Sequence, residues 1–441
     1  LALVMQESGK LVEAEFNYRQ AIRLRPDFAE VHNNLGSVLQ DLHKIEEAVI
    51  SYRNATKLAP SFAIAHYNLA NALQELGDYQ PSMDSYLEAI RLRPDYADAF
   101  HRLGHCQKNL GSIREAGESY SRAIELQPDY AEAYSNLSMT YLMQLNFKQG
   151  FELYEWRWKE AEYEDQFLVS DKPVWSGERD RRVFVWSEQG VGDVLMFATV
   201  LNELIEVSSE VIFACDKRLI PLFERSFSGN ITFISKESVV PEETYDYHIP
   251  VGSLPRFFRP DIESFKKGAG AFLKANPAQT SALRTTLQAG EQTPICGISW
   301  RGGKKGNTRF RSIELVDLAR VLSSSGYKLV NLQYDATTAE LEELKIQHGI
   351  DIMTLSEIDN FHDLDGLASL ISACDLVVSV ANATVYMAGG LGSETRVLLP
   401  FSPDWRWGQT TNQSYWYESL SLYRQEPVSY THLRAHETIA D

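Results

Sequence analysis

The feature that most constrains the fold is a set of residues that recur every 34 positions in the N-terminal part of the chain. Prolines, leucines, tyrosines, alanines and a further small residue each return at their own place in this period. The series are Pro26, Pro60, Pro94 and Pro128; Leu35, Leu69, Leu103 and Leu137; Tyr18, Tyr52, Tyr86, Tyr120 and Tyr154; Ala21, Ala55, Ala89 and Ala123; and Ala14, Ala48, Ser82, Ala116 and Gly150. Several independent positions that keep one period predict a stacked array of equivalent units.

A 34-residue unit with this pattern resembles the tetratricopeptide repeat, which is a helix–turn–helix. The resemblance predicts an α-helical superhelix over residues 1–160 with a concave face. Its first unit is truncated, so the number of repeats before Leu1 stays open. The aromatic run at residues 151–158 is expected to pack the last helix of the array onto the next domain. An acidic segment, assigned to residues 161–180, is expected to act as a linker.

The residue before each repeated leucine is expected to face the concave groove. These four residues are Asn34, Asn68, Arg102 and Asn136. An asparagine amide both donates and accepts hydrogen bonds, so a ladder of them suits an extended peptide backbone of any sequence. They are therefore predicted to line a groove for a protein or peptide partner. The alternative is that asparagine is simply common at this repeat position, and Arg102 interrupts the ladder.

Charge and cysteine usage exclude several classes of function. The formal net charge of −18 argues against general nucleic-acid binding, which needs a basic surface. No run of 18 apolar residues occurs, so no membrane span is expected. The four cysteines contain no CxxC pair, which argues against a zinc site or a disulfide framework and favours a reducing cytoplasm. Residues 428–441 fit no helix or strand period and are interpreted as a non-native tail.

From residue 182 onward, short apolar segments alternate with helical ones. Strands are predicted at residues 183–186, 211–214, 231–234, 245–249, 295–300, 328–333, 352–355, 376–380 and 396–399, and helices at 279–288, 313–323, 339–347 and 364–373. Such alternation predicts parallel sheets with helices on both faces. The pattern restarts near residue 290, so we expect two facing Rossmann-like domains, residues 181–290 and 291–427. In such folds ligands bind at the carboxyl ends of the strands.

The turn after the first predicted strand combines two glycines with an aspartate, Gly190, Gly192 and Asp193. Glycine lets a ligand approach the backbone closely, and a helix start attracts anions. A carboxylate fixed beside a bound phosphate ester can accept a proton from a hydroxyl. The alternative is a tight turn in which the aspartate caps its helix.

Two further clusters lie at predicted strand ends. Residues 300–312 contain five basic residues, among them Lys304, Lys305, Arg309 and Arg311, and no acidic one, so this loop is suited to a diphosphate. The alternative is a solvated basic loop.

In the second cluster, Asn382 or Thr384 is expected to cap a helix whose N–H groups follow Ser379. The alternative is a plain capped turn. Asp363 and Asp365 have DxD spacing, but a helix cap is the preferred interpretation for them.

These clusters, in this order, resemble a bacterial family in which tetratricopeptide repeats precede a glycosyltransferase domain related to the lipopolysaccharide heptosyltransferases. The resemblance covers most of the chain up to about residue 425. It depends on residues 156–158, 188–193, 253–255, 297–300, 311–312, 331–333, 375–380 and 399–407 taken together.

The resemblance implies a B-type fold, a nucleotide-sugar donor, inversion at the sugar carbon, and neither a metal nor a cofactor. Carried over, Asp193 is the catalytic base, and Gly190 and Gly192 admit the acceptor and the donor phosphate. Arg311, with Lys304, Lys305 or Arg309, is expected to neutralise the leaving diphosphate, and the turn with Ser379, Asn382, Thr384 and Tyr386 to bind it.

The chain departs from the family in that last turn. Related enzymes carry an Asp-Thr pair followed by a histidine, where this chain has Ala381-Asn382 and Tyr386. Two other hypotheses therefore stay open. One is a binding scaffold whose transferase domain has lost its chemistry. The other is a protein O-N-acetylglucosaminyltransferase, which also joins repeats to a B-type fold.

Overall fold

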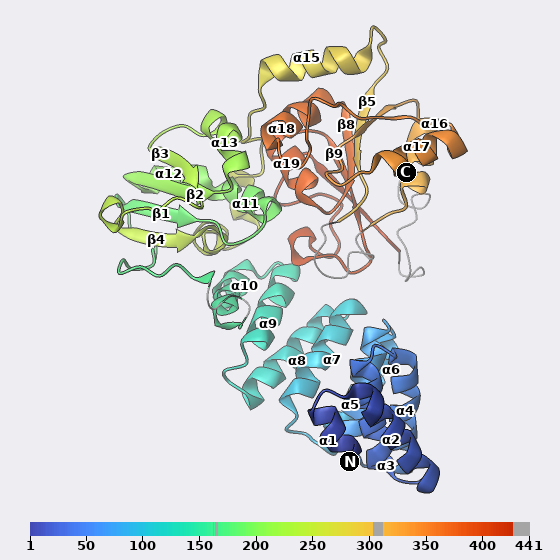
Figure 1. Ribbon diagram of the computed structural model, residues 1–441. Helices are drawn as coiled ribbons and strands as arrows, with labels where there is room; N and C mark the ends of the chain where they lie inside the picture. The colour runs from blue at the N-terminus through green and yellow to red at the C-terminus, as the bar shows by residue number, and fades with distance from the viewer. Residues whose placement is uncertain (162, 164–165, 303–311, 427–441) are drawn as a thin grey trace. The chain divides into compact units, whose positions relative to one another are not determined.

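The computed structural model describes residues 1–161, 163, 166–302 and 312–426 (Figure 1). The chain divides into two compact units, Leu1–Gln144 and Leu145–Asp441. The tail predicted at residues 428–441 lies outside the described part.

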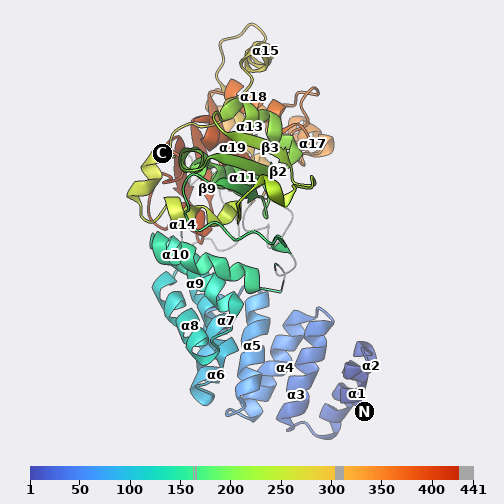
Figure 2. The same ribbon diagram turned by 90° about the vertical axis from the view of Figure 1, so that its left-hand side faces the viewer.

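The first unit consists of α-helices that pack in sequence order, as the repeat period predicts (Figure 2). The repeated small residues Ala14, Ala48, Ser82 and Ala116 are fully buried where helices approach each other. The repeated tyrosines fill the space between them, and a Cβ added at Gly36 would lie only 2.6 Å from the ring of Tyr52. The helices are α1 (Ala2–Glu7), α2 (Leu11–Leu24), α3 (Ala29–Asp41), α4 (Ile45–Leu58), α5 (Ala63–Glu75), α6 (Tyr79–Leu92), α7 (Ala97–Asn109), α8 (Ile113–Leu126) and α9 (Ala131–Met143).

The second unit begins with helix α10 (Phe147–Tyr154) and the short 3-10 helix η1 (Glu155–Lys159). Phe147 contacts the rings of Phe265 and Tyr415, and Phe151 contacts Trp405. The aromatic run thus packs α10 into the α/β unit, as expected for it. Part of the segment predicted as a linker also belongs to this core, because Trp175 is buried and donates its backbone N–H to the carbonyl of His248.

Two parallel sheets form the framework of the second unit. The first has the order β3-β2-β1-β4, and the second the order β10-β9-β8-β5-β6-β7. Their strands are β1 (Arg182–Trp186), β2 (Glu210–Cys215), β3 (Ile231–Ser235), β4 (Tyr247–Pro250), β5 (Ile295–Ser299), β6 (Lys328–Asn331), β7 (Ile352–Met353), β8 (Leu376–Val380), β9 (Thr395–Leu399) and β10 (Leu420–Arg424). All nine predicted strands are present, and β10 is an addition at the edge of the second sheet.

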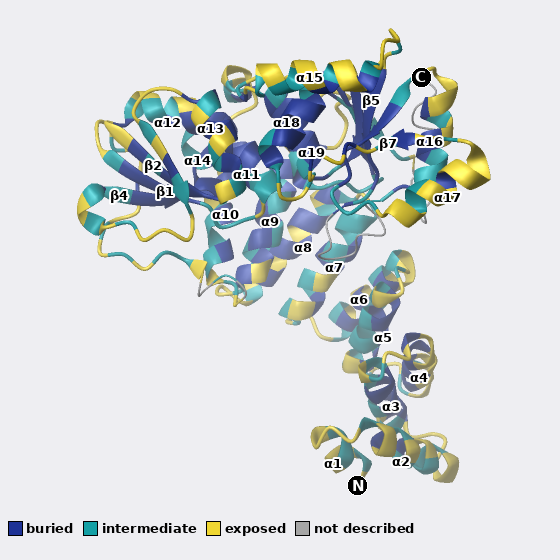
Figure 3. Ribbon diagram, turned by 45° about the horizontal axis from the view of Figure 1, so that its top comes forward, coloured by how far each residue is buried: buried dark blue, intermediate teal, exposed yellow. Residues whose placement is uncertain are grey.

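The longer helices of this unit are α15 (Pro277–Gln288), α16 (Leu315–Ser324), α17 (Thr338–His348), α18 (Leu364–Ala373) and α19 (Ala383–Leu391). Shorter ones are α11 (Val191–Phe197), α12 (Leu201–Val207), α13 (Ile220–Ser226) and α14 (Pro255–Phe258). Strands β5 and β8 and helices α18 and α19 are almost entirely buried, whereas α15 and α17 expose one face (Figure 3). The prediction of parallel sheets with packed helices is confirmed.

Candidate functional site

Each sheet has one point at which the strand order reverses. In the first sheet it lies between β1 and β4, and in the second between β5 and β8. Loops that leave neighbouring strands at such a point separate to opposite faces, which creates the place where doubly wound folds bind ligands. Both reversal points in this protein hold buried polar side chains.

The first reversal point is organised by an ion pair between Glu188 and Arg157. The Arg157 guanidinium lies 3.1 Å from the Glu188 carboxylate, and both side chains are almost completely buried. Arg157 also donates to Ser253 at 2.9 Å, and the backbone N–H of Gly252 donates to Glu188 at 3.2 Å. Burial raises the pKa of Glu188 to about 6, although the positive charge of Arg157 acts to lower it. These contacts fix the turn that leads to Asp193.

The second reversal point is organised by two buried amides, those of Gln333 and Asn382. Gln333 Oε1 accepts from the Ser299 hydroxyl and from the backbone N–H groups of Trp300 and Arg301 at 2.8–3.0 Å. Asn382 Nδ2 donates to Ser299 Oγ at 2.7 Å and to the Arg301 carbonyl at 3.0 Å. Its Oδ1 accepts from the Thr384 N–H at 3.0 Å, so the predicted cap of α19 is confirmed for Asn382.

Helices α11 and α19 bring the two reversal points together. A Cβ added at Gly192 would lie 3.0 Å from Cδ2 of Tyr386 and 3.4 Å from Cα of Ala383. The absence of a side chain at Gly192 permits this close approach of the two helices; the approach of a ligand to Gly192, expected from the sequence, stays a prediction. The turns carrying Gly190–Asp193 and Asn382–Tyr386 are therefore neighbours, although they belong to different sheets.

The Asp193 carboxylate projects from the first turn of α11 and is partly exposed, at 27%. It does not cap its own helix. Instead, its Oδ1 accepts from the Arg406 guanidinium at 2.5 Å. Arg406 also contacts Asp404 at 2.6 Å. Burial would lower the pKa of Arg406, but the carboxylates of Asp404 and Asp193 raise it well above its usual value, so the guanidinium stays charged.

Of the other predicted phosphate-binding residues, three lie in or next to α19, and the basic ones lie outside the described part of the chain. Ser379 is buried and donates to the carbonyl of Val380 at 2.8 Å, and Thr384 is buried at the start of α19. Tyr386 stacks on Trp407, with ring centroids 5.6 Å apart. The basic residues Lys304, Lys305, Arg309 and Arg311 lie outside the described residues. Asp363 caps α18 by accepting from the Gly366 N–H, and Asp365 pairs with Arg225, so the cap interpretation is confirmed.

In the repeats, two of the predicted groove asparagines bond to the preceding repeat. Asn68 Nδ2 donates to Oδ1 of Asn33 at 3.0 Å, and the Asn136 amide lies 3.0 Å from Nε2 of His101. Asn34 lies within 3.4 Å of the Asn33 amide, and Arg102 is exposed. These amides therefore stabilise the stacking of repeats.

Sequence reasoning missed Arg157 and Arg406 as parts of this site. Both arginines occur in the same triplet, Trp156-Arg157-Trp158 and Trp405-Arg406-Trp407. Each reaches the turn between β1 and α11, Arg157 at Glu188 and Arg406 at Asp193. The repeated triplet was the available signal: an arginine flanked by two large apolar side chains is a candidate for burial, and a buried charge needs a partner of opposite sign.

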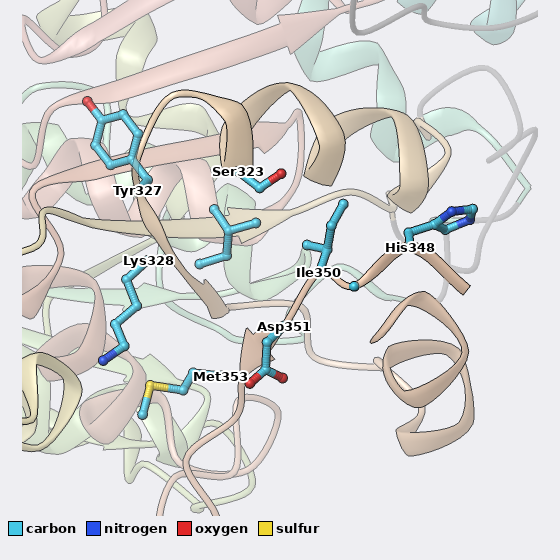
Figure 4. Close-up of a pocket in the computed structure, with 9 residues that line it drawn as sticks. Ser323, Tyr327, Lys328, His348, Ile350, Asp351 and Met353 are labelled. Carbon is cyan, nitrogen blue, oxygen red and sulfur yellow. The ribbon is translucent and has the colours of Figure 1, made fainter. Parts of the chain in front are cut away.

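A surface hollow of about 430 Å³ lies elsewhere on the second unit, between the end of α16, the start of β6 and the turn after α17 (Figure 4). Its lining includes the apolar side chains of Leu329 and Ile350. The side chains of Tyr327, Lys328 and His348 point away from one another, so no group of polar atoms converges there. The hollow also adjoins the amino end of β6, opposite to the strand ends that bind ligands in this architecture.

Within the described residues, no cluster of three or more His, Cys, Asp or Glu side chains is arranged to hold a metal ion. None of the helices in the described part of the chain has the length and apolar character needed to span a membrane.

Two family models match the chain, both within the first unit. A family model described as "TPR repeat" matches residues 6–43, 41–77 and 108–144, and one described as "Tetratricopeptide repeat" matches residues 63–96. Protein FlbA of Caulobacter vibrioides is 31% identical over an alignment of 305 residues, which covers 63% of this chain and 49% of FlbA. The match thus spans about half the length of that relative.

Among solved structures, MamA is similar with 22% identity and a TM-score of 0.36, over 38% of this chain and 98% of MamA. YrrB, described as a TPR protein with an unusual peptide-binding site, is similar with 22% identity and a TM-score of 0.34, over 36% of this chain and 81% of YrrB. The N-terminal region of this chain is an array of tetratricopeptide repeats, and an α/β region with two parallel sheets follows it.

Proposed function

We propose that the second unit is a glycosyltransferase of the B-type fold, and that the repeats recruit its protein or carrier acceptor. The unit would transfer a sugar from a nucleotide-sugar donor to an acceptor hydroxyl, in the cytoplasm and without a metal. One observation carries the proposal: the loops at the reversal points of two parallel sheets meet beside a partly exposed carboxylate, Asp193. Sites of this architecture bind ligands at such points.

In the proposed reaction, the oxygen of the acceptor hydroxyl attacks the anomeric carbon of the donor, and Asp193 takes the proton of that hydroxyl. The bond from that carbon to the diphosphate breaks, and the nucleoside diphosphate leaves with the electron pair. A single displacement of this kind inverts the anomeric carbon. The position of Gly190 supports Asp193 as the base. A Cβ at Gly190 would lie 3.7 Å from Oδ2 of Asp193, so the lack of a side chain there leaves space beside this oxygen. A hydroxyl can therefore approach Oδ2 over the bare backbone.

A second candidate function is a protein-binding scaffold with an inactive transferase domain. The hydrogen bonds of Asn382 favour it, because both its Nδ2 and its Oδ1 are engaged within the protein. The presence of Ala381 and Tyr386, where related enzymes have acidic and histidine side chains, points in the same direction. The repeats alone would then carry the function.

Release of nucleoside diphosphate from a panel of nucleotide sugars separates the two candidates. We expect Asp193→Asn to lower turnover by a factor of about 10²–10⁴, the usual contribution of a general base. Asp246→Asn is the matched control: Asp246 directly precedes β4 of the same sheet, pairs with Arg182 at 2.8 Å and is similarly exposed, but lies at the opposite, amino end of the strands. If no donor binds or is turned over, the scaffold function is the correct one.

A further inference from the structure

Arg406 is held in one place by its own loop. Its guanidinium donates to Asp404 at 2.6 Å, and its backbone N–H donates to the same carboxylate at 3.2 Å. The flanking Trp405 and Trp407 are buried, and the Arg406 side chain is only 13% exposed. The loop is a single 3-10 turn after β9, η9 (Trp405–Trp407), so the guanidinium has little freedom to move.

This fixed guanidinium determines how Asp193 presents its two oxygens. Oδ1 accepts from Arg406, while Oδ2 lies over Gly190 and has no hydrogen-bond partner among the described residues. A rotation of the Asp193 carboxylate would break the contact with Arg406. The ion pair therefore leaves Oδ2 facing the approach over Gly190, while the contact of Oδ1 with Arg406 fixes the orientation of the carboxylate.

We propose that Arg406 is a positioning residue for the reaction proposed above, acting through Asp193, and that it does not bind the donor diphosphate. The inference rests on the proposed function. Both terminal nitrogens of Arg406 already contact carboxylates, so its charge is compensated within the protein. A guanidinium is suited to this role because its planar fork can hold two carboxylates at once, whereas a lysine ammonium is a single point charge.

The test uses the full chain with Arg406→Ala and Arg406→Lys. Arg182→Ala is the control, since Arg182 makes an ion pair of the same kind with Asp246, at the amino end of the first sheet. Binding of UDP, GDP and CDP is measured by calorimetry, and turnover by release of nucleoside diphosphate. We expect Arg406→Ala to lower kcat about 100-fold, the effect of a misplaced catalytic group, with unchanged KM and nucleotide affinity. Added guanidinium ions should restore part of the activity of Arg406→Ala, and Arg406→Lys should remain impaired.

Each other outcome is decisive. A loss of nucleotide affinity in Arg406→Ala would assign the residue to donor binding, and an unchanged kcat would exclude a positioning role. If the wild type turns over no donor, the proposed function fails, and hydrogen exchange of residues 187–193 then tests the inference separately. Faster exchange of this turn in Arg406→Ala, but not in Arg182→Ala, would still support positioning of Asp193, whereas equal exchange would refute it.

Discussion

Replacing Gly192 by alanine tests the close approach of the turns that carry Asp193 and Asn382. The added Cβ would lie 3.0 Å from Cδ2 and 3.3 Å from Cε2 of Tyr386, so the ring would have to move by a few tenths of an ångström. Tyr386 has little room for this because it stacks on Trp407 with an angle of 16° between the rings. The backbone is also close, since Cα of Ala383 would be 3.4 Å away.

The expected magnitude follows from two opposing terms. Overpacking a closely packed position costs about 1–3 kcal/mol, and the better helix propensity of alanine returns about 1 kcal/mol. We therefore expect Gly192→Ala to destabilise the second unit by about 1 kcal/mol and by no more than about 2 kcal/mol. Gly190→Ala is the matched control. Its Cβ would make an ordinary contact of 3.7 Å, and its φ of −71° suits alanine. It should be neutral or stabilising by up to about 1 kcal/mol.

Urea unfolding followed by tryptophan fluorescence measures this difference. All eight tryptophans lie between residues 156 and 416, so the signal reports on the second unit and the repeats do not contribute. If Gly192→Ala is as stable as Gly190→Ala, α11 does not pack closely against α19, and the turns from the two sheets do not form one site.

Two further predictions concern Glu188 and Gly36. Burial raises the pKa of Glu188 from 4.5 to about 6, so the native state holds this proton more tightly than the unfolded state. The stability contributed by Glu188 should fall by about 2 kcal/mol as pH rises from about 4.5 to above 6. Fluorescence-monitored unfolding of the wild type and of Glu188→Gln across this pH range measures the change. If the wild type instead gains stability relative to Glu188→Gln as pH rises, the attraction to Arg157 outweighs the effect of burial on Glu188. In the repeats, Gly36→Ala should cost about 1–3 kcal/mol, because its Cβ would overlap the ring of Tyr52. Circular dichroism of the helices during heating checks this, and an unchanged transition would contradict it.

The repeats and the positions of nine strands along the chain could be predicted from the amino-acid sequence. A repeat unit contacts mainly its own helices and its neighbours, so the apolar and small residues that it needs return with its period. In the α/β region, buried parallel strands need continuous apolar segments, and these located β1 to β9. The edge strand β10 was not predicted because its burial alternates, with Leu420 and Leu422 buried beside the partly exposed Ser421 and Tyr423. The cap at Asn382 was also predictable, because a helix cap is a local requirement of the backbone.

The contacts of the candidate site residues could not be predicted in this way, because they depend on how distant segments pack. Asp193 and Arg406 are 213 residues apart in the chain, and they meet because the order of strands in two sheets and the packing of α11 on α19 bring their loops together. The same holds for the Asn382 amide, whose bonds to Ser299 and Arg301 depend on β8 lying beside β5. A local pattern records which face of a segment is buried, but it does not record which distant side chain covers that face.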